Sequence, residues 1–118
     1  MAETVTLFRP VGKKELDLIA ASGYREFPRR LPEQPIFYPV TNEEYAIQIA
    51  RDWNARLSDD QSGFVTRFEV RKAYLDQYET HIVGGRIHEE YWIPAEKLKE
   101  FNENLVGTIK VIAEFKNP

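Results

Sequence analysis

The chain has 118 residues, of which 42% are hydrophobic and 13% aromatic, and it contains no cysteine. This size and composition predict one packed domain over residues 1–118, and they exclude a disordered segment, a disulfide framework and a cysteine-ligated metal site. The formal net charge of −3 argues against nucleic acid as a partner, because duplex binding depends on a basic face that neutralises phosphates.

The N-terminal residues do not resemble a signal peptide, and no apolar run approaches the ~20 residues that span a bilayer. We therefore expect a cytoplasmic protein without a membrane partner.

The one basic cluster consists of Arg25, Arg29 and Arg30. It indicates either a solvated loop or an anion site, and the loop is the commoner case. The sequence leaves the oligomeric state open.

The N-terminal third predicts two strands separated by a helix and a stiff loop. Residues 4–9 alternate as a strand that a proline ends. Residues 13–22 follow as a helix, with Gly23 as its left-handed cap. Prolines exclude a regular element from residues 24–35. Residues 36–40 predict a short strand that lies at a sheet edge or ends early, because Pro39 cannot donate to a ladder.

The clearest helix of the sequence is predicted over residues 42–54. Thr41 and Glu44 have the spacing of a capping box at its start. Apolar residues recur along it at helical spacing and predict one buried stripe. The stripe contains Tyr45, Ala46, Ile49, Ala50 and Trp53.

The second half of the chain predicts strands over 64–70, 86–93 and 108–115, with short helices over 72–78 and 95–102. Alternation places four apolar residues of the last strand on one face, namely Ile109, Val111, Ala113 and Phe115. The connections are too irregular for a doubly wound parallel sheet. We therefore predict an α+β domain with a curved mixed or antiparallel sheet and three main helices.

The predicted strand over 86–93 carries the most polar pattern. Period-two geometry places His88, Glu90 and Trp92 on one side and Glu89 and Tyr91 on the other. Whichever side meets the core, one carboxylate points inward, where it needs a partner. A structural salt bridge and a functional site both meet this need, and the salt bridge is the commoner outcome.

Several other kinds of site lack their signatures. Trp92 stands where a His-Glu-x-x-His zinc motif needs its second histidine, and the chain has only two histidines. Phosphate-binding glycine loops and Gly-x-Ser-x-Gly are also missing.

Arg9, at the end of the first predicted strand, can clamp a phosphate or pair with a carboxylate, and pairing is the commoner case. Tyr38 can stack on a flat ligand ring or pack in the core, and core packing is the commoner case.

Together, these places resemble the three motif strands of the ADP-ribosyltransferase fold. The first motif, a strand ending in arginine, is similar to Leu7-Phe8-Arg9, and the second, a strand leading into a helix, is similar to residues 37–41. The third, Glu-x-Glu before apolar residues and proline, is similar to residues 88–94, with Glu90 in the catalytic place. Tyr38-Pro39 replaces the usual Ser-Thr-Ser. His88 stands where arginine-modifying transferases keep their first glutamate, which argues against arginine as the acceptor.

The whole chain also resembles a group of small uncharacterised bacterial proteins whose label couples ADP-ribosylation with J-type crystallin. Residues 31–40, 42–45 and 84–88 carry this resemblance. The crystallin part of the label refers to ADP-ribosyl hydrolases, which are larger all-helical proteins with metal-binding aspartates. This short, strand-rich chain is not expected to be such a hydrolase, and no metal site is expected in it.

The resemblance implies that NAD is a substrate, from which ADP-ribose is transferred to an acceptor such as a protein, or which is hydrolysed. Arg9 would hold phosphate or ribose, and Tyr38 would lie near the nicotinamide. Glu90 would bind the ribose 2′-hydroxyl and stabilise an oxocarbenium-like transition state, while His88 and Trp92 would shape the site. Two alternatives stay open. One is a non-catalytic nucleotide- or protein-binding module on the same fold, and the other is an interaction protein such as a toxin inhibitor, whose acidic surface suits a basic partner.

Overall fold

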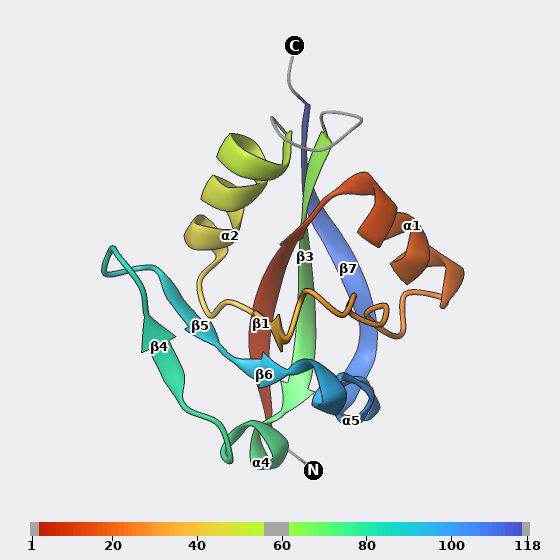
Figure 1. Cartoon of the computed structure of the whole chain (residues 1–118), viewed down its shortest axis with the longest axis vertical. Coiled ribbons are helices and arrows are strands. Elements are labelled where there is room, and N and C mark those ends of the chain that lie inside the picture. The colour runs from red at the N-terminus through yellow and green to blue at the C-terminus, as the bar shows by residue number, and fades with distance from the viewer. Residues whose placement is uncertain (1–2, 56–61, 117–118) are drawn as a thin grey trace.

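Three antiparallel strands form the centre of the molecule in the computed structural model, which describes residues 3–55 and 62–116 (Figure 1). The strands are β1 (Thr4–Val11), β2 (Ile36–Phe37), β3 (Ser62–Arg71), β4 (Thr80–Ile82), β5 (Glu89–Tyr91), β6 (Ile93–Pro94) and β7 (Leu105–Lys116). The helices are α1 (Lys13–Ala21), α2 (Glu43–Ile49), the π-helix η1 (Ala50–Asn54), α4 (Lys72–Leu75), the 3₁₀ helix η2 (Ala95–Lys97) and α5 (Leu98–Glu103). This order confirms the predicted α+β class.

The sheet is more divided than predicted. β3 lies between β1 and β7, while β2 pairs with β6 and β4 pairs with β5, and every strand pair in the described residues is antiparallel. The structure thus has three small sheets where the sequence predicted one curved sheet. Pro39 has no N–H to donate, and the second predicted strand is reduced beyond Phe37 to single bridges from Val40 to Phe8 and Glu90. These bridges place Val40 between β1 and Glu90.

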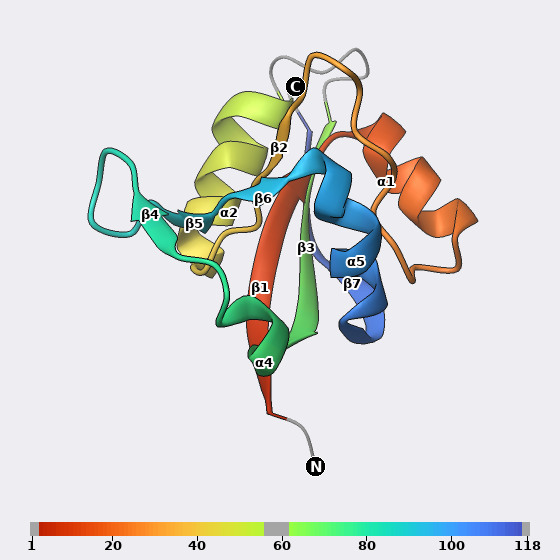
Figure 2. The same ribbon diagram turned by 60° about the horizontal axis from the view of Figure 1, so that its bottom comes forward.

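Helices cover both faces of the central sheet, with α2 on one face and α1 and α5 on the other (Figures 1 and 2). Aromatic rings fill much of the core on the α1 and α5 side, where Phe27 packs against Phe68 with ring centroids 4.8 Å apart. Leu98 and Phe101 of α5 are buried there, as their spacing predicts. On the other face, Ala46 and Ala50 pack against Val65 of β3.

The start of α2 differs from the predicted capping box. The N-cap is Asn42, whose side-chain oxygen accepts a hydrogen bond from the backbone N–H of Tyr45 at 3.2 Å. Thr41 instead donates its hydroxyl hydrogen to Glu89 Oε1 at 2.8 Å. The cap therefore lies one residue later than predicted, because Thr41 is held by the neighbouring strand.

Trp53 does not belong to the buried stripe of this helix, although its spacing predicts it. Its side chain is 64% exposed, whereas Ala46 and Ala50 are fully buried. The chain passes from α-helix to π-helix at Ala50. A π-turn contains more residues than an α-turn and so rotates the following side chains around the axis. Trp53 is thereby turned towards solvent, and Ala55 is buried in its place.

The predicted strand over 86–93 is shorter in the structure. Residues 84–88 form a turn, in which Gly84 has φ +88° and the N–H of His88 donates to the carbonyl of Gly85 at 3.0 Å. Only β5 and β6 remain extended, with Trp92 between them. The partner of β5 is β4, which the sequence did not predict.

The apolar residues of β7 do not share one face, which corrects the prediction from simple alternation. Val65 pairs with Ala113 while the next residue of β3, Thr66, pairs with Val111. This bulge inserts one extra residue, so the side chains beyond it change face. Ile109 accordingly packs in the core with α1 and α5, whereas Ala113 packs on the α2 side.

Candidate functional site

A cleft of about 480 Å³ opens where β1, the segment after β2, and β5 meet. Its lining contains Arg9, Pro10, Tyr38, Val40, Ile49, Val83, Glu90 and Trp92. Most of the residues expected to bind NAD are therefore brought together, although they lie far apart in the sequence. The volume is within the range of roughly 300–1,000 Å³ that small-molecule pockets occupy.

Glu90 has its carboxylate fixed by two neutral donors. The side chain is only 8% exposed. Its Oε2 accepts a hydrogen bond from the Tyr45 hydroxyl at 3.1 Å, and its Oε1 accepts one from the Trp92 indole N–H at 2.9 Å. Among the described residues, no cation pairs with Glu90. The structure therefore shows a buried, oriented carboxylate beside a cleft instead of the commoner salt bridge.

Aromatic side chains form the wall beside Glu90. Trp92 stacks on His81, with ring centroids 3.8 Å apart and planes at 11°, and meets Tyr38 edge to face at 6.3 Å. Tyr38 is 39% exposed and lines the cleft, so it is not the core residue that is the commoner case for a lone aromatic. Its ring offers a flat apolar surface to a ligand.

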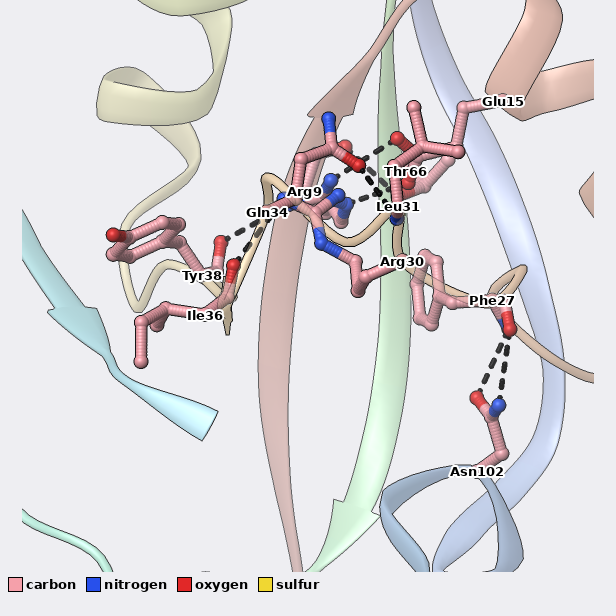
Figure 3. Close-up of polar contacts among 10 residues, drawn as sticks. All are labelled: Arg9, Glu15, Phe27, Arg30, Leu31, Gln34, Ile36, Tyr38, Thr66 and Asn102. Atoms are coloured by element: carbon pink, nitrogen blue, oxygen red, sulfur yellow. Dashed lines mark hydrogen bonds and ion pairs between the residues drawn. The ribbon is translucent and has the colours of Figure 1, made fainter. Parts of the chain in front are cut away.

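Arg9 is a buried residue of the cleft lining and is paired with a carboxylate (Figure 3). Its Nε and Nη2 donate to the two oxygens of Glu15 at 2.6 and 3.0 Å. Its Nη1 reaches only the backbone carbonyl of Tyr38, at 3.5 Å. The guanidinium also lies 4.6 Å from the centre of the Phe37 ring. The pairing that the sequence favoured is therefore present, and Nη1 is the group best placed to turn to a ligand.

The Arg9–Glu15 pair should contribute measurably to stability. We expect Glu15→Gln to lower the free energy of unfolding by about 1–3 kcal/mol, because it leaves the buried guanidinium of Arg9 without its charged acceptor. Asp17→Asn is the matched control. It removes an exposed pair between Asp17 and Lys13 and should cost less than about 1 kcal/mol. Urea unfolding of both variants measures the difference, and equal losses would contradict a special role for the buried pair.

His88 lies behind the cleft and not in its lining. Its ring stacks on Tyr45 with centroids 4.5 Å apart, and its Nε2 lies 3.0 Å from Gln48 Oε1. It lines a separate hollow of about 360 Å³ beside Trp53. The turn over residues 84–88 replaces the strand that would have carried His88 onto the same side as Glu90. In this position His88 supports Tyr45, which in turn binds Glu90.

Tyr45 belongs to the site but was predicted only as part of an apolar helix stripe. No sequence spacing joins it to Glu90, because the two are 45 residues apart and meet through tertiary packing. Burial, the charge of Glu90 and the hydrogen bond to it together raise the pKa of Tyr45 to about 12. Tyr45 thus stays a neutral donor to the carboxylate over the physiological range.

This coupling gives a test at alkaline pH. A raised pKa means that Tyr45 contributes stability that is complete below pH ~10 and is lost as the pH rises from there through about 12. We expect Glu90→Gln to lower the pKa of Tyr45, because it removes the negative charge that opposes ionisation. An NMR titration of the Tyr45 ring carbons measures this shift. An unchanged pKa in the variant would contradict the contact.

Within residues 3–55 and 62–116, no group of three histidine, aspartate or glutamate side chains is placed to hold a metal ion. In the same part of the chain, no helix has the length and apolarity to cross a membrane. No protein-family model matches the chain, and neither does a curated protein or a solved structure.

Proposed function

We propose that this chain has an ADP-ribosyltransferase-like fold and binds NAD in the cleft, where it breaks the bond between nicotinamide and ribose. The observation that carries the proposal is the convergence of Arg9, Tyr38 and Glu90 on one cleft. These residues stand at the three places that resemble the motifs of that family. A chance resemblance of short motifs gives no reason for the three side chains to meet.

Glu90 is suited to stabilise positive charge. As the C–N bond breaks, nicotinamide leaves as a neutral molecule with the bonding electron pair, and positive charge develops at the ribose C1′. A fixed carboxylate that accepts a hydrogen bond from the 2′-hydroxyl lowers the energy of this oxocarbenium-like state. Water, or a nucleophile of an acceptor, then attacks C1′ and loses a proton. Tyr45 and Trp92 orient the carboxylate without neutralising it.

The remaining walls suit the flat end of this substrate. Tyr38 and Trp92 provide aromatic surface for the nicotinamide ring, and Arg9 provides a cation for phosphate or ribose. The cleft thus combines apolar walls with a few directed polar groups, as ligand sites generally do. These residues bind and orient the substrate, while Glu90 acts on the reacting bond.

Incubation with NAD labelled in the nicotinamide and, separately, in the adenylate tests the proposal. We expect released nicotinamide, with the adenylate label either free as ADP-ribose or attached to an acceptor. Saturable NAD binding without release would instead favour the non-catalytic nucleotide-binding module. If the protein neither binds NAD nor releases nicotinamide from it, the result would contradict both the enzyme and the nucleotide-binding module. It would favour a protein-interaction role.

A further inference from the structure

A second arginine lies beside Arg9 and forms no ion pair with a carboxylate within residues 3–55 and 62–116. Arg30 belongs to the loop between α1 and β2, and its side chain lies next to that of Arg9 (Figure 3). Its guanidinium lies 6.0 Å from the centre of the Phe37 ring, and the guanidinium of Arg9 lies 4.6 Å from the same centre. The two cations therefore share one aromatic residue. Two like charges beside one ring repel each other unless an anion lies close to both.

The two guanidinium groups have fewer hydrogen-bond acceptors around them than their N–H donors need. Both oxygens of Glu15 are bound by Arg9. Arg30 donates from Nη2 to the backbone carbonyl of Ile36 at 3.2 Å, and within the described residues its Nε is buried without any partner. One positive charge is thus left uncompensated. Burial and the charge of Arg9 lower the pKa of Arg30, and the charge of Glu15 offsets only part of this effect.

The arginine pair lies between two hollows of the surface. Arg9 lines the cleft that contains Glu90. Arg30 lines a larger groove of about 1,080 Å³, which runs between the proline-rich loop and α5 and includes Gln34 and Lys99. A ligand with one end in each hollow would pass the two guanidinium groups at its middle. A dinucleotide has its pyrophosphate at that point.

We propose that Arg9 and Arg30 together bind the pyrophosphate of a dinucleotide whose second nucleoside occupies the groove between the proline-rich loop and α5. Guanidinium groups bind phosphate oxygens through paired N–H donors, and a pyrophosphate offers oxygens to both arginines at once. The dinucleotide part of this proposal rests on the proposed function. The anion site itself rests only on the arginine pair.

Calorimetric titration with inorganic pyrophosphate tests the site apart from NAD chemistry. We expect the wild type to bind it and Arg30→Gln to bind it about 10–100-fold more weakly, as loss of a charged hydrogen-bonding group implies. Arg25→Gln is the matched control, since Arg25 is exposed in the same loop and lines neither the cleft nor the groove, and the change in net charge is identical. It should alter affinity less than about twofold, within the usual effect of an exposed charge. Equal losses in both variants, or no binding to the wild type, would overturn the proposal.

Thermal melting controls for folding of the variants. Pyrophosphate should raise the melting temperature of the wild type and not that of Arg30→Gln, because a native-state ligand stabilises only a protein that binds it. If Arg30→Gln does not fold, Arg30→Lys keeps the charge but loses the planar donor fork, and it should bind more weakly than the wild type. Unchanged binding by Arg30→Lys would then overturn the site.

The two proposals fail in different ways. Pyrophosphate binding without nicotinamide release from NAD would contradict the proposed function and leave the anion site standing. Nicotinamide release by Arg30→Gln at an unchanged KM for NAD would contradict the anion site and leave the proposed function standing.

Discussion

Glu90→Gln is expected to slow nicotinamide release from NAD by about 10²–10³-fold, the usual effect of removing one group that stabilises charge in a transition state. The affinity for NAD should change little, because the charge at C1′ develops only as the bond breaks. Glutamine has nearly the same shape, and its carbonyl can still accept from Trp92. Steady-state rates of both proteins give the comparison.

Glu89→Gln is the control for this variant. Glu89 precedes Glu90 on β5, but its oxygens accept from the hydroxyls of Thr41 and Thr80 at 2.8 and 2.9 Å. It does not line the cleft. The change in charge is the same, so we expect the rate of nicotinamide release to stay within about twofold of the wild type, as for a substitution that touches no transition-state contact. A similar loss in both variants would contradict the role of Glu90.

Gly63→Ala is expected to give the largest loss of stability among single methyl additions. A Cβ at Gly63 would lie 2.1 Å from the carbonyl oxygen of Ala50 and 3.0 Å from the backbone nitrogen of Ala55. Both are backbone atoms at the π-turn, which cannot rotate away as a side chain can. Overpacking of this kind costs about 1–3 kcal/mol and occasionally more. Urea unfolding measures the cost.

Gly85→Ala provides the comparison for that measurement. The nearest atoms to its new methyl group would be those of the His88 ring, at 3.3 Å. A ring on a turn can move by a few tenths of an ångström, so we expect a loss below about 1 kcal/mol, typical of a substitution outside the core. If Gly63→Ala were as stable as Gly85→Ala, the close contact between β3 and the π-turn would be wrong.

The strands and the helix face that hold this site can be predicted from local patterns in the sequence. A strand over the residues around Glu90 follows from alternation, and so does the strand that carries Arg9. The predicted end of that strand at Arg9 is wrong, because β1 continues through Pro10 to Val11. The buried face of α5 follows from the spacing of Leu98 and Phe101. Each of these depends on a repeat that a few neighbouring residues contain, so the sequence alone can predict it.

The contacts that complete the site depend on tertiary packing. The Tyr45 hydroxyl donates a hydrogen bond to Glu90 from a helix that is 45 residues away in the chain. Glu15 pairs with Arg9 because α1 folds back over β1. The π-turn that exposes Trp53 adds one residue to a helical turn, which a strict period of 3.6 misses. Likewise, the turn that moves His88 out of the cleft interrupts an otherwise even alternation. Such single-residue irregularities change which face a side chain takes while leaving the element type unchanged.

One NMR titration tests the central claim most directly. The chain has two tryptophans, and the indole N–H of Trp92 is bound to Glu90 in the cleft whereas Trp53 is exposed elsewhere. On addition of NAD we expect the Trp92 indole signal, assigned with Trp92→Phe, to shift saturably while the Trp53 signal stays in place. The signals of free nicotinamide should then grow in the same sample. An unmoved Trp92 signal with intact NAD would contradict the claim that this cleft binds and cleaves NAD.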